Sequence, residues 1–427
     1  ANEKLVNFVI GVIANPSVED SLLDFMKTGQ TLAEKYVSER LVEPNRKSIY
    51  DTIPKSGVKT MSEQQKQVNV NGKKITIDGE VMFLRLMAIN AHKKVPVQRL
   101  MSFENSPVPL SMFREDGTMY STGDKSEYMK RLEQRLGSKI TSMESTPQVV
   151  IHDAMAVIRS HPPLQIGVYT FKQMAVKFLQ IIIQASHGCK EIHIAFDRYF
   201  DNSTKNLTRE KRGACAINYH VHPNGIIPSN WANFLMSAEN KTKLSKLYTE
   251  FIIDNKHTLG DQMIVMSGGQ GDDAVKVTCD RIEKIDELTS RIEEADARLV
   301  LHAVYASKAQ EVKNLVVCSP DTDVFALLLH HVSKIEAEVF METGQQTSLR
   351  SNKRYIPIKK IHDTLSKAEQ KIQMSIYALT GCDTVSMFRG KGKVTAINTM
   401  HKMADELLPL EHLGIGQQVS QEIIDKC

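Results

Sequence analysis

Val149-Val-Ile-His-Asp153 is a short apolar run that ends in a carboxylate, and two later runs end in the same way. These are Ile192-His-Ile-Ala-Phe-Asp197 and Leu315-Val-Val-Cys-Ser-Pro-Asp321-Thr-Asp323. Each run predicts a buried strand. Amphipathic helical patterns alternate with the runs, which favours an α/β fold with a mainly parallel sheet flanked by helices. Because ligands bind beyond the carboxyl ends of strands in such sheets, we expect these acids to meet at one edge.

More carboxylates come from helical segments. Glu294 and Asp296 precede the apolar face of a predicted helix, and Asp383 follows another helical pattern. Alone, such acids are usually helix caps or turn formers. Together they make a set of seven: Asp153, Asp197, Glu294, Asp296, Asp321, Asp323 and Asp383.

Gathered in one cleft, these acids would repel each other by several kcal/mol at about 4 Å unless cations compensate. Oxygen-only ligands suit hard ions, so we expect Mg²⁺ or Mn²⁺ rather than zinc. Two such ions can act together in phosphodiester hydrolysis, where one activates the attacking water and both stabilise the transition state. The set therefore predicts a two-metal site.

Composition restricts the remaining possibilities. The chain has 427 residues, of which 41% are hydrophobic and 24% charged, as in folded globular proteins. A net charge of +4 is too small to identify a polyanionic partner. Six scattered cysteines without a CxxC pair predict reduced thiols in an intracellular protein. We expect no membrane segment and see no targeting signal. The start at Ala1 is compatible with a piece of a longer chain.

The pattern divides the chain into two parts. Residues 1–146 carry no concentrated chemistry and predict an N-terminal domain of unknown role, with helices at 22–41 and 81–91 and a hairpin across Asn71-Gly72. Residues 147–427 form the expected catalytic core. Within it, 198–292 are expected to be an inserted cap- or arch-like region, and we interpret 267–273, which is rich in glycine, as a flexible turn.

The acidic motifs resemble those of the flap endonuclease and xeroderma pigmentosum group G superfamily, the structure-specific branch of PIN-like nucleases. The resemblance covers about residues 148–400 and implies a PIN-like fold with a helix-two-turn-helix element at 379–403. Some of these motifs are also similar to those of uncharacterised animal proteins with this core. The matching motifs are Asp153-Ala-Met-Ala, Phe196-Asp197-Arg, Glu294-Ala-Asp296-Ala, Asp321-Thr-Asp323, Thr380-Gly-Cys-Asp383 and Arg389-Gly-Lys-Gly-Lys393.

The resemblance implies a Mg²⁺-dependent nuclease that cuts DNA. In this hypothesis Asp153, Asp197, Glu294 and Asp296 hold the first ion, and Asp321, Asp323 and Asp383 hold the second. Lys205 and Arg209 are expected to act as electrostatic helpers in catalysis, beside Lys211 and Arg212, which are expected to bind nucleic acid. The resemblance further implies that the helix-two-turn-helix grips a duplex, with a monovalent cation, through Arg389, Gly390, Lys391, Gly392 and Lys393.

Two departures from the family pattern leave alternatives open. A long segment precedes Asp153, and Arg159 stands where the family has a base-stacking aromatic residue. Threading of free 5′ ends is therefore not expected. One alternative is a nucleic-acid-binding or scaffold protein whose nuclease-like core does not cut. Another is a PIN nuclease that cuts RNA, although DNA is favoured. A DNA nuclease would act in the nucleus.

Overall fold

The computed structural model describes most of the chain, and its description is confined to the following residues. They are 5, 13–44, 46–48, 67–70, 73–76, 96, 111–114, 118–120, 124–138, 142–200, 217–269, 271–344, 353–382, 385–416 and 419–426. The chain divides into two compact units, residues 1–120 and 121–427. The second unit thus begins earlier than the boundary expected at 146/147. The reason is that Tyr128 and Leu132, on a helix at 126–133, are fully buried in its core.

The first unit contains two helices and a hairpin in its described part. The expected helical segment at 22–41 is divided between helices α1 and α2 and a short π-helical turn. The hairpin predicted across Asn71-Gly72 is confirmed, because Val70 pairs with Lys73 and leaves a two-residue connection. The helix expected at 81–91 lies outside the described residues. The elements are α1 (Pro16–Leu23), α2 (Phe25–Val37), η1 (Ser38–Val42), β1 (Gln67–Val70) and β2 (Lys73–Thr76).

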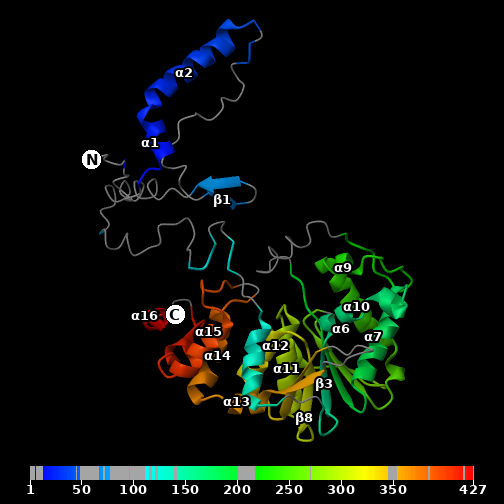
Figure 1. Ribbon diagram of the computed structural model, residues 1–427. Coiled ribbons are helices and arrows are strands. Elements are labelled where there is room, and N and C mark those ends of the chain that lie inside the picture. Colours follow the sequence, from blue (N-terminus) through cyan, green and yellow to red (C-terminus); the bar gives the residue numbers. More distant parts are fainter. Residues whose placement is uncertain are drawn as a thin grey trace. The chain divides into compact units, whose positions relative to one another are not determined.

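The second unit is an α/β fold built on one sheet, as the sequence predicts (Figure 1). Its described residues form eight strands in the order β10-β9-β8-β3-β4-β5-β6-β7, with the five from β9 to β5 parallel. Three of these strands come from the region expected to be an inserted cap. The strands are β3 (Val149–Asp153), β4 (Glu191–Ala195), β5 (Met263–Ser267), β6 (Ala274–Val277), β7 (Ile282–Lys284), β8 (Asn314–Cys318), β9 (Glu338–Thr343) and β10 (Arg354–Pro357).

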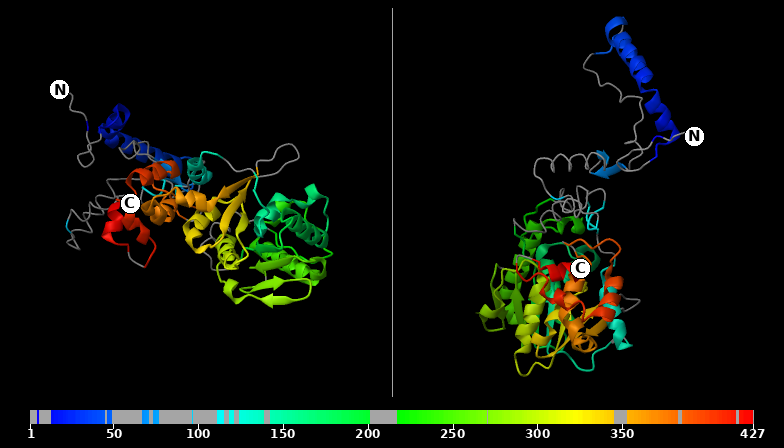
Figure 2. Two further views of the ribbon diagram at one scale, coloured as in Figure 1. Left: turned by 90° about the horizontal axis from the view of Figure 1, so that it is seen from below. Right: turned by 90° about the vertical axis from the view of Figure 1, so that its left-hand side faces the viewer.

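Helices cover both faces of this sheet, and Figure 2 gives two further views of them. The α-helices are α5 (Ser126–Glu133), α6 (Ala154–Ser160), α7 (Phe171–Ala185), α9 (Trp231–Phe234), α10 (Ala238–Asp254), α11 (Ala295–Ser307), α12 (Thr322–His331), α13 (Ile358–Asp363), α14 (Lys367–Leu379), α15 (Lys393–Met403) and α16 (Gln421–Lys426). The short 3₁₀ turns are η3 (Gln134–Leu136), η4 (Pro163–Ile166), η5 (Lys256–Thr258), η6 (Asp286–Leu288), η7 (Val332–Lys334) and η8 (Leu408–His412). Among the described helices, none is long and apolar enough to cross a bilayer.

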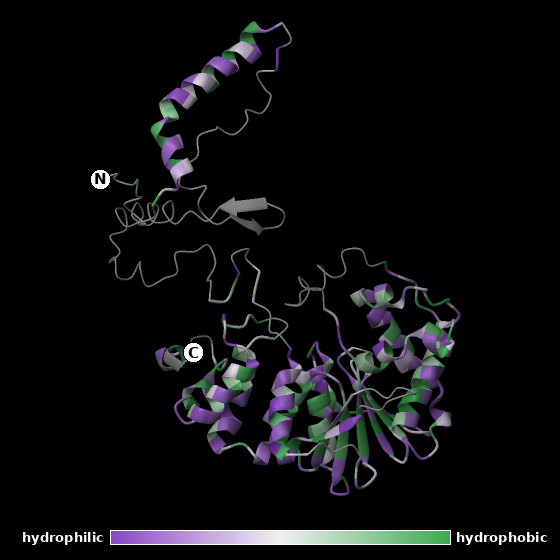
Figure 3. Ribbon diagram, in the orientation of Figure 1, coloured by the Kyte–Doolittle hydropathy of each residue, from purple (hydrophilic) through white to green (hydrophobic). Residues whose placement is uncertain are grey.

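Buried apolar residues form two main clusters around the sheet, and Figure 3 shows that its central strands are largely hydrophobic. Val149 and Ile151 of β3 pack in one cluster with α11 and α12. Ile192 and Ile194 of β4 pack in another with α7 and α10. Successive strand residues point to opposite faces, so a strand that is buried on both faces is a continuous apolar run in the sequence.

A buried hydrogen-bonded chain fixes α11 against the sheet. His302 of α11 lies 2.7 Å from the hydroxyl of Ser267 on β5 and 2.8 Å from His193 Nδ1 on β4. His193 in turn lies 2.7 Å from the Glu191 carboxylate. Burial holds the pKa of His302 well below its usual value, so this ring stays neutral. These contacts hold the middle of α11 against β4 and β5.

The glycine-rich segment after β5 is tightly fitted rather than flexible at its start. Gly268 has φ +84, and a Cβ there would lie closer than 3.0 Å to the Phe196 carbonyl oxygen at the end of β4. A Cβ on Gly269 would overlap Thr249 of α10 in the same way. The close approach brings the chain after β5 directly beside Asp197.

Gly268→Ala should therefore destabilise the protein more than Gly167→Ala. Gly167 also has a positive φ, +69, but nothing lies within 4 Å of the position that a Cβ would take there, so it is a matched control. The left-handed backbone alone costs about 1–2 kcal/mol for an alanine. We expect that loss in Gly167→Ala and a larger one in Gly268→Ala, measured by urea unfolding. Equal losses would contradict the tight fit.

Candidate metal centre

The three strands that end in acids are neighbours in the sheet. β3 lies between β8 and β4 and pairs with both in parallel, so the carboxyl ends of all three reach the same edge. The chain runs from β3 through β4 to β5 on one side and returns to β8 on the other side. The gap between β3 and β8 is thus a topological switch point, the usual position of a ligand in such sheets.

Asp153 occupies the middle of this edge and is almost fully buried. It caps α6, because its Oδ1 accepts a hydrogen bond from the Ala156 backbone N–H at 3.0 Å. Its Oδ2 accepts one from the Ser319 hydroxyl at 3.4 Å. Burial, with the nearby Asp197 charge, raises the pKa of Asp153 to about 6.

Asp197 connects the end of β4 to the start of α11. Its Oδ1 accepts a hydrogen bond from the Ala295 backbone N–H at 2.8 Å, and its Oδ2 accepts one from the Tyr199 hydroxyl at 3.2 Å. Ala295 lies between Glu294, the N-cap of α11, and Asp296 in its first turn. The strand end thereby fixes where these two acids lie.

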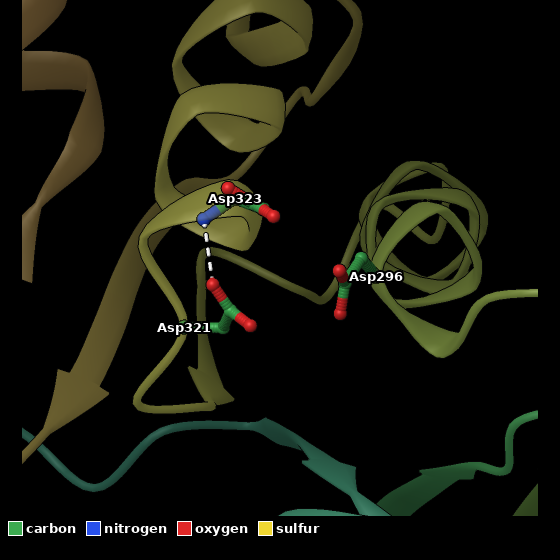
Figure 4. Close-up of side chains that lie close together, drawn as sticks. All are labelled: Asp296, Asp321 and Asp323. Carbon is green, nitrogen blue, oxygen red and sulfur yellow. Dashed lines mark hydrogen bonds between the residues drawn. The ribbon is translucent and has the colours of Figure 1, made fainter. Parts of the chain in front are cut away.

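Asp296, Asp321 and Asp323 come closest together (Figure 4). One carboxylate oxygen from each lies within 4.8 Å of the other two. Asp321 caps α12 and accepts a hydrogen bond from the Asp323 backbone N–H at 2.9 Å. We call these three residues the acidic triad. The hypothesis assigns Asp296 to one ion and Asp321 and Asp323 to the other, whereas the triad takes members from both groups.

Burial and the neighbouring carboxylates strongly shift the pKa of Asp296. Its pKa rises to about 8, first because it is buried and then because four other carboxylates repel its charge. These are Asp321, Asp153, Asp197 and Asp323. Five acids therefore act on one another in a small volume. Asp383 lies outside the described residues, so its predicted membership stays a prediction.

Two side chains that sequence reasoning missed contact Asp323. The Lys125 ammonium lies 3.2 Å from its Oδ2, and the Tyr377 hydroxyl donates a hydrogen bond to its Oδ1. Lys125 precedes α5 and Tyr377 lies on α14. No motif marked either residue, because Lys125 ends a long connection and Tyr377 fits the apolar face of its helix.

Lys393, expected to bind nucleic acid, is buried. Its ammonium donates to the carbonyls of Tyr377 and Gly381 at 3.2 and 3.0 Å and to the Thr380 hydroxyl at 3.1 Å. It also lies 3.7 Å from the centre of the Tyr377 ring. Burial lowers its pKa to about 8. A phosphate contact by this ammonium would require those bonds to open, and in this arrangement Lys393 holds Tyr377.

The other predicted basic residues are exposed or undescribed. Arg389 and Lys391 lie on the surface between α14 and α15, beside Gly390 with φ +74 and ahead of Gly392, the N-cap of α15. Their predicted role in gripping a duplex stays a prediction. Lys205, Arg209, Lys211 and Arg212 lie outside the described residues.

No model of a known protein family matches the chain, and no curated protein sequence matches it.

The raised pKa of Asp296 predicts that the metal-free protein loses stability as pH rises. Between about pH 4 and pH 8 the folded protein holds a proton on Asp296 that the unfolded chain has released. The free energy of unfolding therefore falls through this window. Asp296→Asn should reduce the fall and raise the melting temperature near pH 8 in EDTA by several degrees.

The exposed Asp286→Asn is the matched control and should keep the wild-type pH profile. Asp153 also titrates in this window, so Asp296→Asn should flatten the profile only in part. A profile in Asp296→Asn as steep as that of the wild type would contradict the raised pKa.

Lys125→Met should destabilise the metal-free protein and strengthen binding of Mn²⁺. Removal of the ammonium takes away one of the two side chains that contact the Asp323 carboxylate, a loss of about 1.5–3 kcal/mol for a hydrogen bond to a charged group. It also removes a cation that competes for the same carboxylate. Lys130→Met on the helix that follows Lys125 is the control, because Lys130 pairs with Asp124 at 2.9 Å and Glu127 at 3.1 Å. Calorimetric Mn²⁺ titration measures the effect, and unchanged affinity would contradict it.

Proposed function

We propose that the chain is a divalent-metal-dependent nuclease with a PIN-like core, hydrolysing phosphodiester bonds in DNA by a two-metal mechanism. The observation that carries the proposal is the meeting of Asp153, Asp197, Asp296, Asp321 and Asp323 at one switch point of a parallel sheet. Residues far apart in the sequence supply these carboxylates, in the order of the motifs that resemble structure-specific nucleases.

The donor set suits a hard divalent cation. Each member of the acidic triad offers a carboxylate oxygen, and the triad contains no His or Cys, which favours Mg²⁺ or Mn²⁺. Two carboxylates at 4 Å repel by about 4 kcal/mol at an effective dielectric near 20. Protonation of Asp296 relieves part of this repulsion in the metal-free protein, and a bound cation would relieve it at neutral pH.

The elements that carry the acids also favour a phosphate. Helices α6, α11 and α12 begin at Asp153, Glu294 and Asp321, which are their N-caps. Helix N-termini carry partial positive charge and attract anions. Bound divalent ions would supply a nucleophilic water and neutralise charge on the phosphate. The chain itself holds the carboxylates in position through the Ala295, Ala156 and Asp323 backbone amides and the Tyr377 hydroxyl.

The choice of DNA rests on the resemblance of the motifs, and a nuclear location follows from that choice. A chain with this site that cuts RNA would use the same carboxylates. Direct comparison of matched RNA and DNA substrates distinguishes the two.

The proposal predicts Mn²⁺- or Mg²⁺-dependent cleavage that Asp321→Asn abolishes. Asp321 belongs to the acidic triad and caps α12, and an asparagine can still cap a helix, so the variant should fold. We expect a fall in cleavage rate of at least about a hundredfold on flap, nicked and single-stranded DNA. The control Asp286→Asn should leave the rate unchanged.

Equal rates in Asp321→Asn and wild type would exclude the assignment. Binding of nucleic acid without cleavage by any of these proteins would instead favour the binding-only alternative. A Mn²⁺ titration on the same samples tells whether the carboxylates hold ions in that case.

A further inference from the structure

Arginines lie close to Asp197 in the sequence and share the carboxylate of Asp272. Arg198 directly follows Asp197, and its backbone N–H donates to the Glu293 carbonyl at 2.7 Å. Its guanidinium lies 4.7 Å from the centre of the Phe200 ring and forms an ion pair with Asp272. The side chain is thus held in place within one residue of a predicted metal ligand.

A second arginine meets the same carboxylate from the opposite side. Arg291 Nε lies 3.4 Å from Asp272 Oδ2, and the Arg291 side chain is 91% exposed. Asp272 therefore lies between two guanidinium groups, one fixed and one free to move in solvent. Two cations against one carboxylate leave an excess of positive charge beside the acidic cluster.

A third guanidinium lies beneath them. Arg298 of α11 is completely buried, and its Nη2 donates to the carbonyls of Ser290 and Ile292. Among the described residues its Nε and Nη1 find no hydrogen-bond partner. Burial and the nearby Arg198 charge lower the pKa of Arg298, and the Asp197 carboxylate partly offsets this effect.

The loop that carries Asp272 can release its carboxylate without unfolding. The Asp272 backbone is held, because its carbonyl accepts a hydrogen bond from the Ser290 N–H at 3.0 Å. Gly268 and Gly269 fix the start of the loop, and open space surrounds Gly271. The Asp272 side chain is itself 36% exposed. Rotation of that one side chain would break both of its ion pairs and leave the two guanidinium groups without their shared carboxylate.

We propose that Arg198 and Arg291 form a subsite for a backbone phosphate of a nucleic acid, and that Asp272 fills it when no nucleic acid is bound. The subsite rests on the proposed function, because its ligand is the phosphate adjacent to the one at the carboxylates. Guanidinium groups match the planar oxygen pairs of phosphate better than ammonium groups do. Asp272 mimics that anion and weakens binding of singly charged competitors.

The test measures how salt weakens binding of a short single-stranded DNA in Ca²⁺ and in EDTA. Each lost phosphate contact reduces the slope of log Kd against log salt by about 0.7 for single strands. Arg291→Gln should show this reduction. Arg281→Gln is the matched control, because Arg281 is also exposed and pairs with Glu283 at 3.0 Å on the neighbouring hairpin. Asp272→Asn should bind several-fold more tightly.

Equal slopes in Arg291→Gln and Arg281→Gln, or weaker binding by Asp272→Asn, would overturn the subsite. Cleavage assays on the same variants separate this failure from failure of the nuclease proposal. Metal-dependent cleavage by the wild type, together with an unchanged salt slope in Arg291→Gln, would reject the subsite and leave the nuclease proposal standing. A changed slope without cleavage by the wild type would support the subsite and reject the nuclease.

Discussion

Repulsion between carboxylates at the end of β3 is the constraint on which the rest of the site depends. β3 lies between β8 and β4, so the acids that follow these strands cannot avoid one another. Asp296, brought in by α11, is the most strongly affected, because its pKa rises to about 8. A bound divalent cation would relieve this repulsion, and in this way the sheet topology supports the proposed chemistry.

The chain limits this repulsion with its own groups. Backbone amides at the starts of α6, α11 and α12 donate to Asp153, Asp197 and Asp321. Lys125 and Tyr377 contact Asp323, and the buried Lys393 holds the Tyr377 ring. Asp272 similarly lies between Arg198 and Arg291. Each of these two places thus contains an internal ion pair. In the proposals above, a metal ion would replace Lys125 beside Asp323, and a phosphate would replace Asp272 between the arginines.

The sequence predicted the sheet and its acidic edge because both have local signals. Apolar runs such as Val149–Asp153 identify strands, and parallel topology then brings their ends together. Lys125 and Tyr377 had no such signal, since their contacts with Asp323 depend on how α5 and α14 pack. The same holds for Arg198 and Asp272, which only the close approach of Gly268 to Phe196 places side by side. Strands β5 to β7 lie in the region 198–292 that was expected to be an inserted cap, and the structure makes them part of the central sheet instead.

The most direct test of the account is anomalous diffraction from crystals of the protein soaked in Mn²⁺. The account predicts two peaks among the predicted ligands, one of them bound by oxygens of Asp296, Asp321 and Asp323, at the distances of about 2.0–2.2 Å typical of small divalent ions. Carboxylates that point to separate surfaces, or a saturated crystal with no peak among them, would contradict it.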